Sequence, residues 1–298
     1  MLNVLTLIAG TAPSILDPQI LAGVTAALVE ADAQVGPVDW LAPDRACDIP
    51  FEGIDPVVAE QIARSRLDDA CIDLAAQSES GRRKRLLLAD MESTIITREL
   101  LDELATFLGI SAQIAPITAR SMRGEIDFAQ SLRARVSLLA GRPVAVLGLV
   151  SERIELMPGA RRLVGTMRAS GAYTVLVSGG FDCFAAIAAK ACGFDEFQAN
   201  HLIIASGHIT GQVAEPILDR DGKRAILERL TETGRIPREA TAAIGDGAND
   251  IAMLQAAGLG VAFRGKPAVA AAARFRLDHS DLTGLLYLQG YRSHEFKE

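Results

Sequence analysis

The stretch Leu86-Leu87-Leu88-Ala89-Asp90-Met91-Glu92-Ser93-Thr94 decides the fold of this chain. Its first four residues form a continuous apolar run, as in a parallel strand that is buried on both faces of a sheet. Two similar runs, residues 173–177 and 240–244, each lead into a glycine-containing loop and a segment with helical spacing. The sequence therefore predicts an α/β fold with a doubly wound parallel sheet, like a Rossmann fold.

A long segment of about 80 residues with helical spacing separates the first of these strands from the second. We predict helices over residues 99–108, 114–122 and 127–139. An insertion directly after the first strand lies above the carboxyl ends of the strands, where open α/β sheets bind ligands. We therefore interpret residues 97–155 as a helical cap.

The first 80 residues have a different pattern. Strands are expected over residues 3–9, 34–41, 47–51 and 70–75, with helices over 17–31 and 56–66. This order, β-α-β-β-α-β, predicts a small α+β domain of the ferredoxin-like (ACT-like) type, residues 1–80, followed by the α/β domain, residues 81–298. Domains of this type often bind amino acids or mediate dimers, so a homodimer is one expectation.

The composition is that of a globular protein, with 49% hydrophobic and 22% charged residues among 298. A net charge of −7 argues against a nucleic-acid partner. The basic run Arg82-Arg83-Lys84-Arg85 is the local exception, and we expect it to be a solvated linker. Because no apolar run is long enough to span a bilayer and the apolar start lacks a basic segment, we expect a cytoplasmic protein without a membrane partner.

Polar residues follow the first two predicted strands of the α/β part. Asp90 and Glu92 lie two positions apart, so both side chains can face one pocket, about 6.6 Å apart along the strand. Two carboxylates at the end of a buried strand need a cation, a proton or solvent. The second strand runs into Ser178-Gly179-Gly180, where small residues at the start of a helix favour the binding of an anion.

The third strand leads into Gly245-Asp246-Gly247-Ala248-Asn249-Asp250. Carboxylate and amide oxygens of this kind are suited to a hard cation, and Mg²⁺ is usually held by one or two carboxylates with phosphate and water. Lys223 precedes a predicted helix over residues 224–230 and could supply the fixed positive charge that a phosphoryl pocket needs.

Taken together and in this order, the segments 90–94, 178–180 and 245–250 with Lys223 resemble the four motifs of the haloacid dehalogenase superfamily. Three further matches resemble the phosphoserine phosphatases of that superfamily: Glu99, the stretch Met122-Arg123-Gly124-Glu125-Ile126-Asp127-Phe128, and the stretch Ser131-Leu132-Arg133-Ala134-Arg135-Val136. The resemblance covers residues 86–288 and leaves out the N-terminal part.

The resemblance implies a mechanism. Asp90 would be the nucleophile that forms an aspartyl-phosphate, and Glu92 the general acid and then base. Mg²⁺ would be held by the Asp90 side chain, the main-chain carbonyl of Glu92 and Asp246, with Asp250 supporting the site from close by. The reaction would be the hydrolysis of phosphoserine to serine and phosphate, the last step of serine biosynthesis.

The resemblance also implies how the substrate is held. The phosphoryl group would bind to Ser178, the Gly179 amide and Lys223, and Asn249 would contribute to substrate binding. Glu99 would pair with the substrate's ammonium and Arg135 with its carboxylate. Met122 and Phe128 would close the pocket against water.

One residue departs from the family pattern, because the family usually has Asp where this chain has Glu92. The additional methylene group moves the carboxyl group by about 1 Å, which matters where positioning is tight. Two alternatives therefore remain open. One is a phosphatase of the same fold for another small phosphomonoester. The other is a non-catalytic sensor of serine or phosphoserine, which the presence of Glu92 keeps open.

Overall fold

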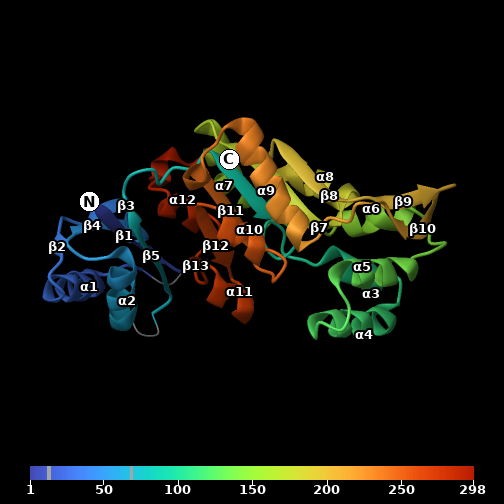
Figure 1. Cartoon of the computed structure of the whole chain (residues 1–298), viewed down its shortest axis with the longest axis horizontal. Coiled ribbons are helices and arrows are strands. Elements are labelled where there is room, and N and C mark those ends of the chain that lie inside the picture. The colour runs from blue at the N-terminus through green and yellow to red at the C-terminus, as the bar shows by residue number, and fades with distance from the viewer. Residues whose placement is uncertain (12–14, 68–69) are drawn as a thin grey trace.

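The computed structural model describes residues 1–11, 15–67 and 70–298, without the side chain of Met122. Three parts follow one another along the longest axis of the molecule (Figure 1). A sheet with two helices lies at the N-terminal end, a second sheet flanked by helices lies in the middle, and α3, α4 and α5 lie at the far end.

The central sheet is parallel throughout, and its strand order is β13-β12-β11-β6-β7-β8. Its six strands are β6 (Leu86–Asp90), β7 (Tyr173–Phe181), β8 (Glu196–Asn200), β11 (Thr241–Gly245), β12 (Leu259–Phe263) and β13 (Phe275–Leu277). The order reverses beside β6, the strand that carries the deciding stretch. This confirms the predicted doubly wound α/β fold.

Both faces of the central sheet are buried, which explains why residues 86–89 of β6 form a continuous apolar run. Leu86 and Leu88 join one core cluster, and Leu87 and Ala89 join another on the opposite face. The first cluster includes residues of α9 (Arg220–Gly234), α10 (Ile251–Ala256) and α11 (Pro267–Ala272). The second includes residues of α7 (Ala160–Ala169), α8 (Asp182–Cys192) and α12 (Gly284–Leu288).

Five helices lie between β6 and β7 in the described chain. The last is α7, which packs on the central sheet, and the four before it are α3 (Leu100–Phe107), α4 (Ser111–Met122), α5 (Phe128–Ser137) and α6 (Ala145–Ser151). The three predicted helices of this segment are confirmed, and α4 begins three residues earlier than predicted. A hairpin of β9 (Leu202–Ala205) and β10 (His208–Val213) lies at the same end of the molecule (Figure 1).

The N-terminal sheet is antiparallel, with the order β2-β4-β1-β5 and with β3 paired to β4. Its elements are β1 (Asn3–Ala9), α1 (Pro18–Glu30), β2 (Gln34–Val35), β3 (Asp39–Ala42), β4 (Ala46–Glu52), α2 (Pro56–Leu67) and β5 (Ile72–Ser78). The prediction of a single strand over residues 34–41 is wrong. The segment is split at Gly36 and Pro37, because a proline has no N–H for the ladder.

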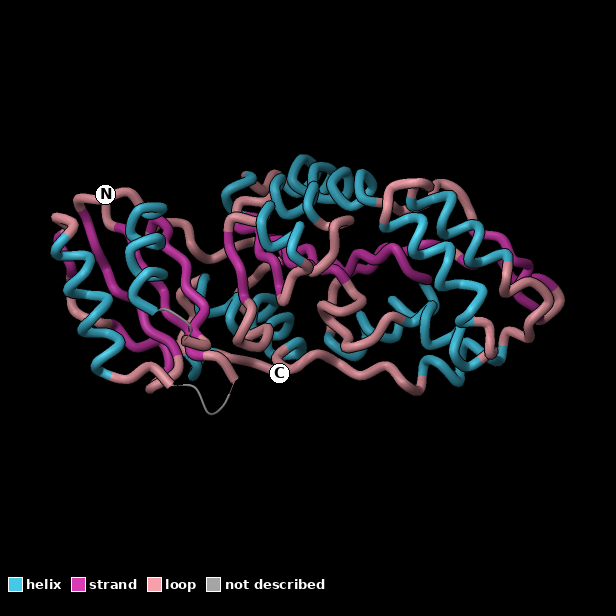
Figure 2. Tube along the Cα trace, turned by 90° about the horizontal axis from the view of Figure 1, so that it is seen from below, coloured by secondary structure: helices cyan, strands magenta, loops and turns pink. Residues whose placement is uncertain are grey.

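The two faces of the N-terminal sheet have different neighbours. Leu5 and Leu7 of β1 pack in a core with α1 and α2. Ile8 of β1 and Ala75 of β5 instead join the same core cluster as α12 and the central sheet. The sheet therefore lies between its own two helices and the C-terminal part of the chain. Figure 1 shows α12 near this sheet, and Figure 2, viewed from the side of α1 and α2, shows the helices in front of the N-terminal strands.

The basic run after β5 is only partly the solvated linker that we predicted, because Arg83 and Arg85 are exposed whereas the other two residues are buried. Arg82 and Lys84 are both 8% exposed. The Lys84 ammonium donates to the carbonyl oxygens of Gly81 and Glu239, at 2.9 and 2.7 Å. The fold can tolerate the burial of these two charged groups because each has polar partners within hydrogen-bonding distance.

Within the described ranges, none of the helices combines the length and apolar character that crossing a membrane requires.

Candidate active site

Three neighbouring parallel strands bring the predicted residues to one edge of the central sheet. Asp90 is the last residue of β6, which lies between β11 and β7. In the register, Ala89 is opposite Ile244 of β11, and Asp90 is opposite Val177 of β7. Asp246 and Ser178 therefore emerge beside Asp90, as expected for the carboxyl ends of parallel strands.

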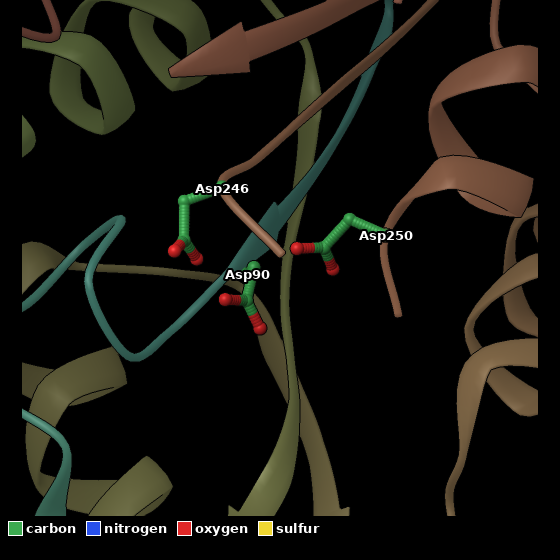
Figure 3. A group of neighbouring side chains, drawn as sticks. All are labelled: Asp90, Asp246 and Asp250. Carbon is green, nitrogen blue, oxygen red and sulfur yellow. The ribbon is translucent and has the colours of Figure 1, made fainter. Parts of the chain in front are cut away.

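A cluster of three buried carboxylates forms at this edge. Asp90, Asp246 and Asp250 each offer an oxygen atom, and these atoms lie within 4.8 Å of one another. The three side chains come from β6 and from the segment after β11, and they point toward a common space (Figure 3). Asp250 is completely buried, and the other two are 5–6% exposed.

Lys223 of α9 supplies the positive charge inside this cluster. Its Nζ atom contacts Oδ1 of Asp90 and lies 2.7 Å from Oδ1 of Asp250, and its side chain is fully buried. Burial lowers the pKa of the Lys223 ammonium, but the Asp250 and Asp90 carboxylates outweigh burial and raise this pKa above its usual value. Lys223 is therefore a permanent cation in contact with Asp90.

The single positive charge of Lys223 does not neutralise the three carboxylates of the cluster. Burial raises the pKa of Asp90 well above its usual value, and the neighbouring Asp250 carboxylate raises it further. Burial also raises the pKa of Asp246, against the opposing effect of the Lys266 ammonium, whose Nζ atom lies 3.2 Å from Oδ2. A bound divalent cation would offset this excess of negative charge, and a set of hard oxygen donors suits such a cation.

The glycines after β11 allow this segment to fold back on itself. A Cβ atom added to Gly245 would collide with the carboxyl group of Asp250. The Gly247 amide donates to Oδ2 of Asp250 at 2.9 Å, and a Cβ atom on Gly247 would collide with Oδ1 of Asn249. Larger side chains at positions 245 and 247 would displace the carboxylate and amide groups of the site.

The last part of β7, residues 178–180, has the form expected of an anion site, and we call it the anion loop. The pairing of β7 with β8 is irregular between Val177 and Phe181, which frees the intervening residues from a regular ladder. The Gly180 amide donates to Oγ of buried Ser178 at 2.9 Å. A Cβ atom on Gly179 would lie 2.8 Å from Cζ of Phe128, so the ring of Phe128 from α5 covers this loop.

Glu92 lies two residues after the end of β6, and its side chain reaches toward the inserted helices. Its Oε1 atom accepts a hydrogen bond from the Leu100 amide at 2.8 Å. Its Oε2 atom would lie 3.1 Å from a Cβ atom added to Gly180, so the carboxyl group also borders the anion loop. Burial and the Glu99 carboxylate raise the pKa of Glu92 to about 7, a value suited to a group that both gives and takes a proton near neutral pH.

The two charged residues predicted to recognise a substrate head group lie on different helices. Glu99 is the N-cap of α3, and its Oε1 atom accepts a hydrogen bond from the Ser93 hydroxyl at 2.8 Å. Arg135 of α5 is partly buried, and within the described residues no carboxylate lies within 4.0 Å of its guanidinium. Burial lowers the pKa of Arg135, while Asp102, Glu92 and Glu99 act in the opposite direction.

Comparison with known families gives the same result as the geometry. The sequence model of the haloacid dehalogenase-like hydrolase family matches residues 87–255, more than half of the chain. The chain belongs to the haloacid dehalogenase-like hydrolases. The match runs from β6 to α10, and so includes every strand end described above.

Several of the similar proteins are phosphoserine phosphatases. The chain is 43% identical to phosphoserine phosphatase SerB2 of Mycobacterium tuberculosis, over 74% of this chain and 54% of that protein. It is 40% identical to a phosphoserine phosphatase of Lactococcus lactis, over 68% of this chain and 94% of that protein. The predicted family is therefore confirmed, although the chain spans only about half the length of the first relative.

A solved structure is similar over almost the whole chain. The unliganded structure of a probable phosphoserine phosphatase from Vibrio cholerae has a TM-score of 0.78 and 30% identity. The similarity covers 98% of this chain and 88% of that one, so it includes the N-terminal sheet.

Three residues that contact the candidate site were not identified from the sequence. Lys266 pairs with Asp246, and Ser93 donates to Glu99. Asn200, at the end of β8, donates to the Gly179 carbonyl and accepts from the Leu218 amide, at 2.9 and 2.7 Å. It ties the anion loop to the segment that precedes α9. Only Asn200 had a usable signal, because it is a polar residue at the end of a strand.

The binding of a divalent cation to the carboxylate cluster should raise the melting temperature, which can be measured without any assay of activity. At about 100 times its dissociation constant, a ligand of the folded state adds about 2.7 kcal/mol of stability. In a chain of this size that is a rise of about 5 °C in the melting temperature. We expect MgCl₂ to produce this rise in the wild type, as measured by differential scanning fluorimetry.

The matched variants are Asp246→Asn, which should abolish the rise, and Glu99→Gln, which should leave it intact. An equal rise in all three proteins would show that the cation does not bind at the cluster.

Proposed function

We propose that this hydrolase is a Mg²⁺-dependent phosphoserine phosphatase that works through an aspartyl-phosphate on Asp90. The observation that carries this proposal is the pairing of two kinds of site at one place. The buried Asp90, Asp246 and Asp250 cluster with Lys223 supports phosphoryl transfer. Arg135, which has no carboxylate partner among the described residues, and Glu99 supply charges complementary to an amino-acid head group.

The first step uses Asp90 as the nucleophile. A carboxylate oxygen of Asp90 forms a bond to phosphorus while the bond from phosphorus to the seryl oxygen breaks. Glu92 donates its proton to that departing oxygen, so serine leaves as the neutral alcohol. Lys223 orients the Asp90 carboxylate and, with Ser178 and the Gly179 amide, holds the phosphoryl oxygens.

The second step releases phosphate. Glu92, now ionised, removes a proton from a water molecule, whose oxygen attacks phosphorus and expels the Asp90 carboxylate. Phosphate leaves and Glu92 is again protonated, so the cycle is closed. Phe128, which covers the anion loop, excludes other water molecules from the acyl-phosphate.

The residues that would hold Mg²⁺ are the side chains of Asp90 and Asp246 and the main-chain carbonyl of Glu92, with Asp250 supporting them. When bound, the cation would offset the negative charge of the phosphate, which would otherwise repel the Asp90 carboxylate. The support for this assignment is the excess of buried carboxylates at the site.

The nucleophile assignment predicts that Asp90→Asn lowers phosphate release from phosphoserine by at least about 10³-fold. The measurement is phosphate release with Mg²⁺, beside acid-quench trapping of labelled phosphate on the protein. Glu92→Asp is the informative companion. If the wild type is as inactive as Asp90→Asn while Glu92→Asp turns over, the chain is a sensor and not an enzyme.

The head-group assignment predicts a cross-over between two substrate analogues. Arg135→Met should lower kcat/KM for phosphoserine, by about 10- to 100-fold, because a charged hydrogen bond is lost. The variant should have no such effect on phosphoethanolamine, which lacks the carboxylate. Glu99→Gln should lower kcat/KM for phosphoserine but not for 3-phosphoglycerate, which has a hydroxyl group in place of the ammonium.

Glycerol phosphate, which lacks both charges, is the control substrate. Equal rates of the wild type on phosphoserine and glycerol phosphate would instead identify a phosphatase for other small phosphomonoesters.

We also propose a division into two domains, an ACT-like domain over residues 1–80 and a phosphatase domain over 81–298 whose segment 97–155 acts as a cap. The element order of the N-terminal sheet and the position of α3 to α6 after β6 support this division. So does the Lactococcus lactis relative, because the chain covers 94% of that protein with 68% of its own length. The homodimer remains a prediction.

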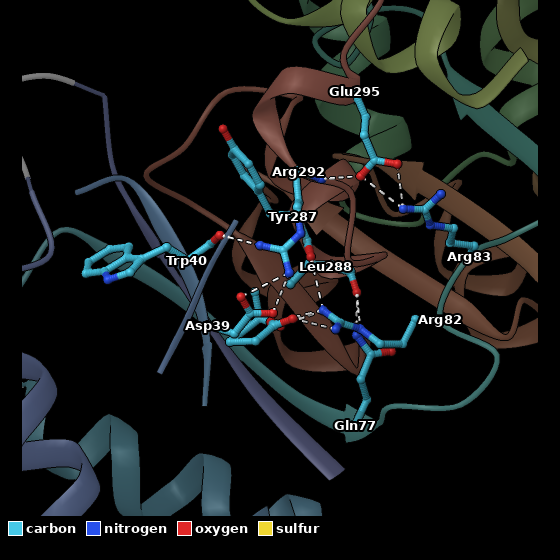
Figure 4. Close-up of polar contacts among 11 residues, drawn as sticks. Asp39, Trp40, Gln77, Arg82, Arg83, Tyr287, Leu288, Arg292 and Glu295 are labelled. Atoms are coloured by element: carbon cyan, nitrogen blue, oxygen red, sulfur yellow. Dashed lines mark hydrogen bonds and ion pairs between the residues drawn. The ribbon is translucent and has the colours of Figure 1, made fainter. Parts of the chain in front are cut away.

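Buried polar contacts join the proposed domains. The Arg82 guanidinium binds both carboxylate oxygens of Asp48, at 2.6 and 3.1 Å, and also donates to the carbonyl oxygens of Tyr287 and Leu288 (Figure 4). Asp73 of β5 is 4% exposed and accepts from the amides of residues 278, 279 and 280. A buried charged group that loses its partner has a large free-energy cost unless water reaches it. We therefore infer that these contacts hold the two domains in a fixed arrangement.

A second pair, between Arg292 and Asp39, also engages both carboxylate oxygens, through the Nη2 atom of Arg292 alone (Figure 4). Unlike the first pair, it is exposed at the surface. The two pairs give a matched comparison. Asp48→Asn should destabilise the protein by about 3–5 kcal/mol, because it leaves the buried Arg82 guanidinium without its counter-charge. Asp39→Asn should cost about 1 kcal/mol or less.

The measurement is the midpoint of urea unfolding of each variant beside the wild type. Similar shifts for Asp48→Asn and Asp39→Asn would contradict the inference that the buried contacts hold the domains together.

A further inference from the structure

The first turn of α3 lacks a cap of its own. Amide groups at the start of a helix have no partner within the helix, and the N-cap side chain usually satisfies one of them. The N-cap of α3, Glu99, makes no such bond. The Leu100 amide instead donates to Oε1 of Glu92, at 2.8 Å. Glu92, in the loop of residues 91–94 that follows β6 and that we call the catalytic loop, therefore caps this helix from outside.

A neighbouring contact strengthens the same junction. Ser93 has a positive φ of 58°, and its hydroxyl donates to Oε1 of Glu99 at 2.8 Å. Two consecutive residues of the catalytic loop, 92 and 93, thus hold two consecutive residues at the start of α3, 100 and 99. The proposed proton-transfer group and the proposed ammonium ligand are therefore held by neighbouring contacts at the same junction.

The length of the side chain at position 92 makes this junction feasible. The carboxyl group of Glu92 lies between the Leu100 amide and the anion loop at Gly180. An aspartate lacks one methylene group, which shortens the reach of its carboxyl group by about 1 Å. From the same backbone position, its carboxyl group would leave the Leu100 amide beyond hydrogen-bonding distance. The residue that departs from the family pattern is therefore the one that reaches the helix.

We propose that the Leu100 amide is a positioning group for Glu92, through which α3 aligns the proton-transferring carboxyl group while Glu99 on the same turn binds the substrate. The proposal rests on the proposed function. It makes glutamate the functional residue at position 92 of this chain, and it couples head-group binding to the orientation of the catalytic acid.

The sharpest test removes the Leu100 N–H without removing the helix. Proline is well tolerated at the first position of a helix, and the residue before it must be extended. Glu99 already has such a backbone, with φ −90° and ψ 105°. Leu100→Pro therefore deletes the donor, and Leu100→Ala is the matched control that loses side-chain packing but keeps the donor.

For phosphoserine, we expect kcat of Leu100→Pro to fall below that of Leu100→Ala by up to about 100-fold, with KM nearly unchanged, because the carboxyl group is misplaced rather than the substrate lost. In a Glu92→Asp background the two Leu100 variants should be equal, since the shorter side chain does not reach the amide. Equal kcat values in the wild-type background, or an undiminished difference in the Glu92→Asp background, would overturn the proposal.

A second measurement does not require turnover. Hydrogen–deuterium exchange over residues 98–103 of the full-length protein should become faster in Glu92→Asp, which loses the contact to the Leu100 amide. It should stay slow in Glu92→Gln, which keeps the length and an accepting oxygen. An unchanged exchange rate over residues 98–103 in Glu92→Asp would contradict the positioning role of the Leu100 amide. An inactive wild type with the expected exchange pattern would instead refute only the phosphatase assignment.

Discussion

The burial of the Lys223 ammonium between the carboxylates of Asp90 and Asp250 is the contact on which the rest of the site depends. These three groups come from β6, α9 and the segment after β11, so the contact fixes three elements in one place. Charged groups are tolerated in such a position only when they are paired. The pairing also holds the Asp90 carboxylate in a region from which most water is excluded, which suits the nucleophile role that we propose for it.

The remaining parts of the molecule surround this contact. The central sheet presents its strand ends at one edge, and the helices inserted after β6 bring Phe128, Glu99 and Arg135 to the same edge. The N-terminal sheet lies at the end of the molecule opposite to α3, α4 and α5, and the face of this sheet that is turned away from α1 and α2 packs against α12. Its buried polar contacts to the C-terminal segment make it part of the folded unit, whereas nothing in it reaches the carboxylate cluster among the described residues.

The sequence predicted those features that depend on local pattern. The apolar strands and the polar residues at their ends were correct, because burial on both faces and the chemistry of strand ends leave a direct mark on the sequence. Features that depend on distant partners were missed. Arg82 is buried because Asp48 lies opposite, and Asn200 matters because Gly179 and Leu218 converge on it. The split between β2 and β3 was the exception, since Pro37 was visible in the sequence.

The central claim is that Asp90 and Asp246 share one divalent cation beside a bound phosphoryl group. The most direct measurement is a crystal structure of the protein with Mn²⁺ and a tetrahedral fluoride analogue of the aspartyl-phosphate, with anomalous diffraction to locate the metal. The account predicts a single anomalous peak in contact with both carboxylates, and the analogue bonded to Asp90 within reach of Lys223 and Ser178. A metal held elsewhere, or an analogue that does not engage Asp90, would contradict it.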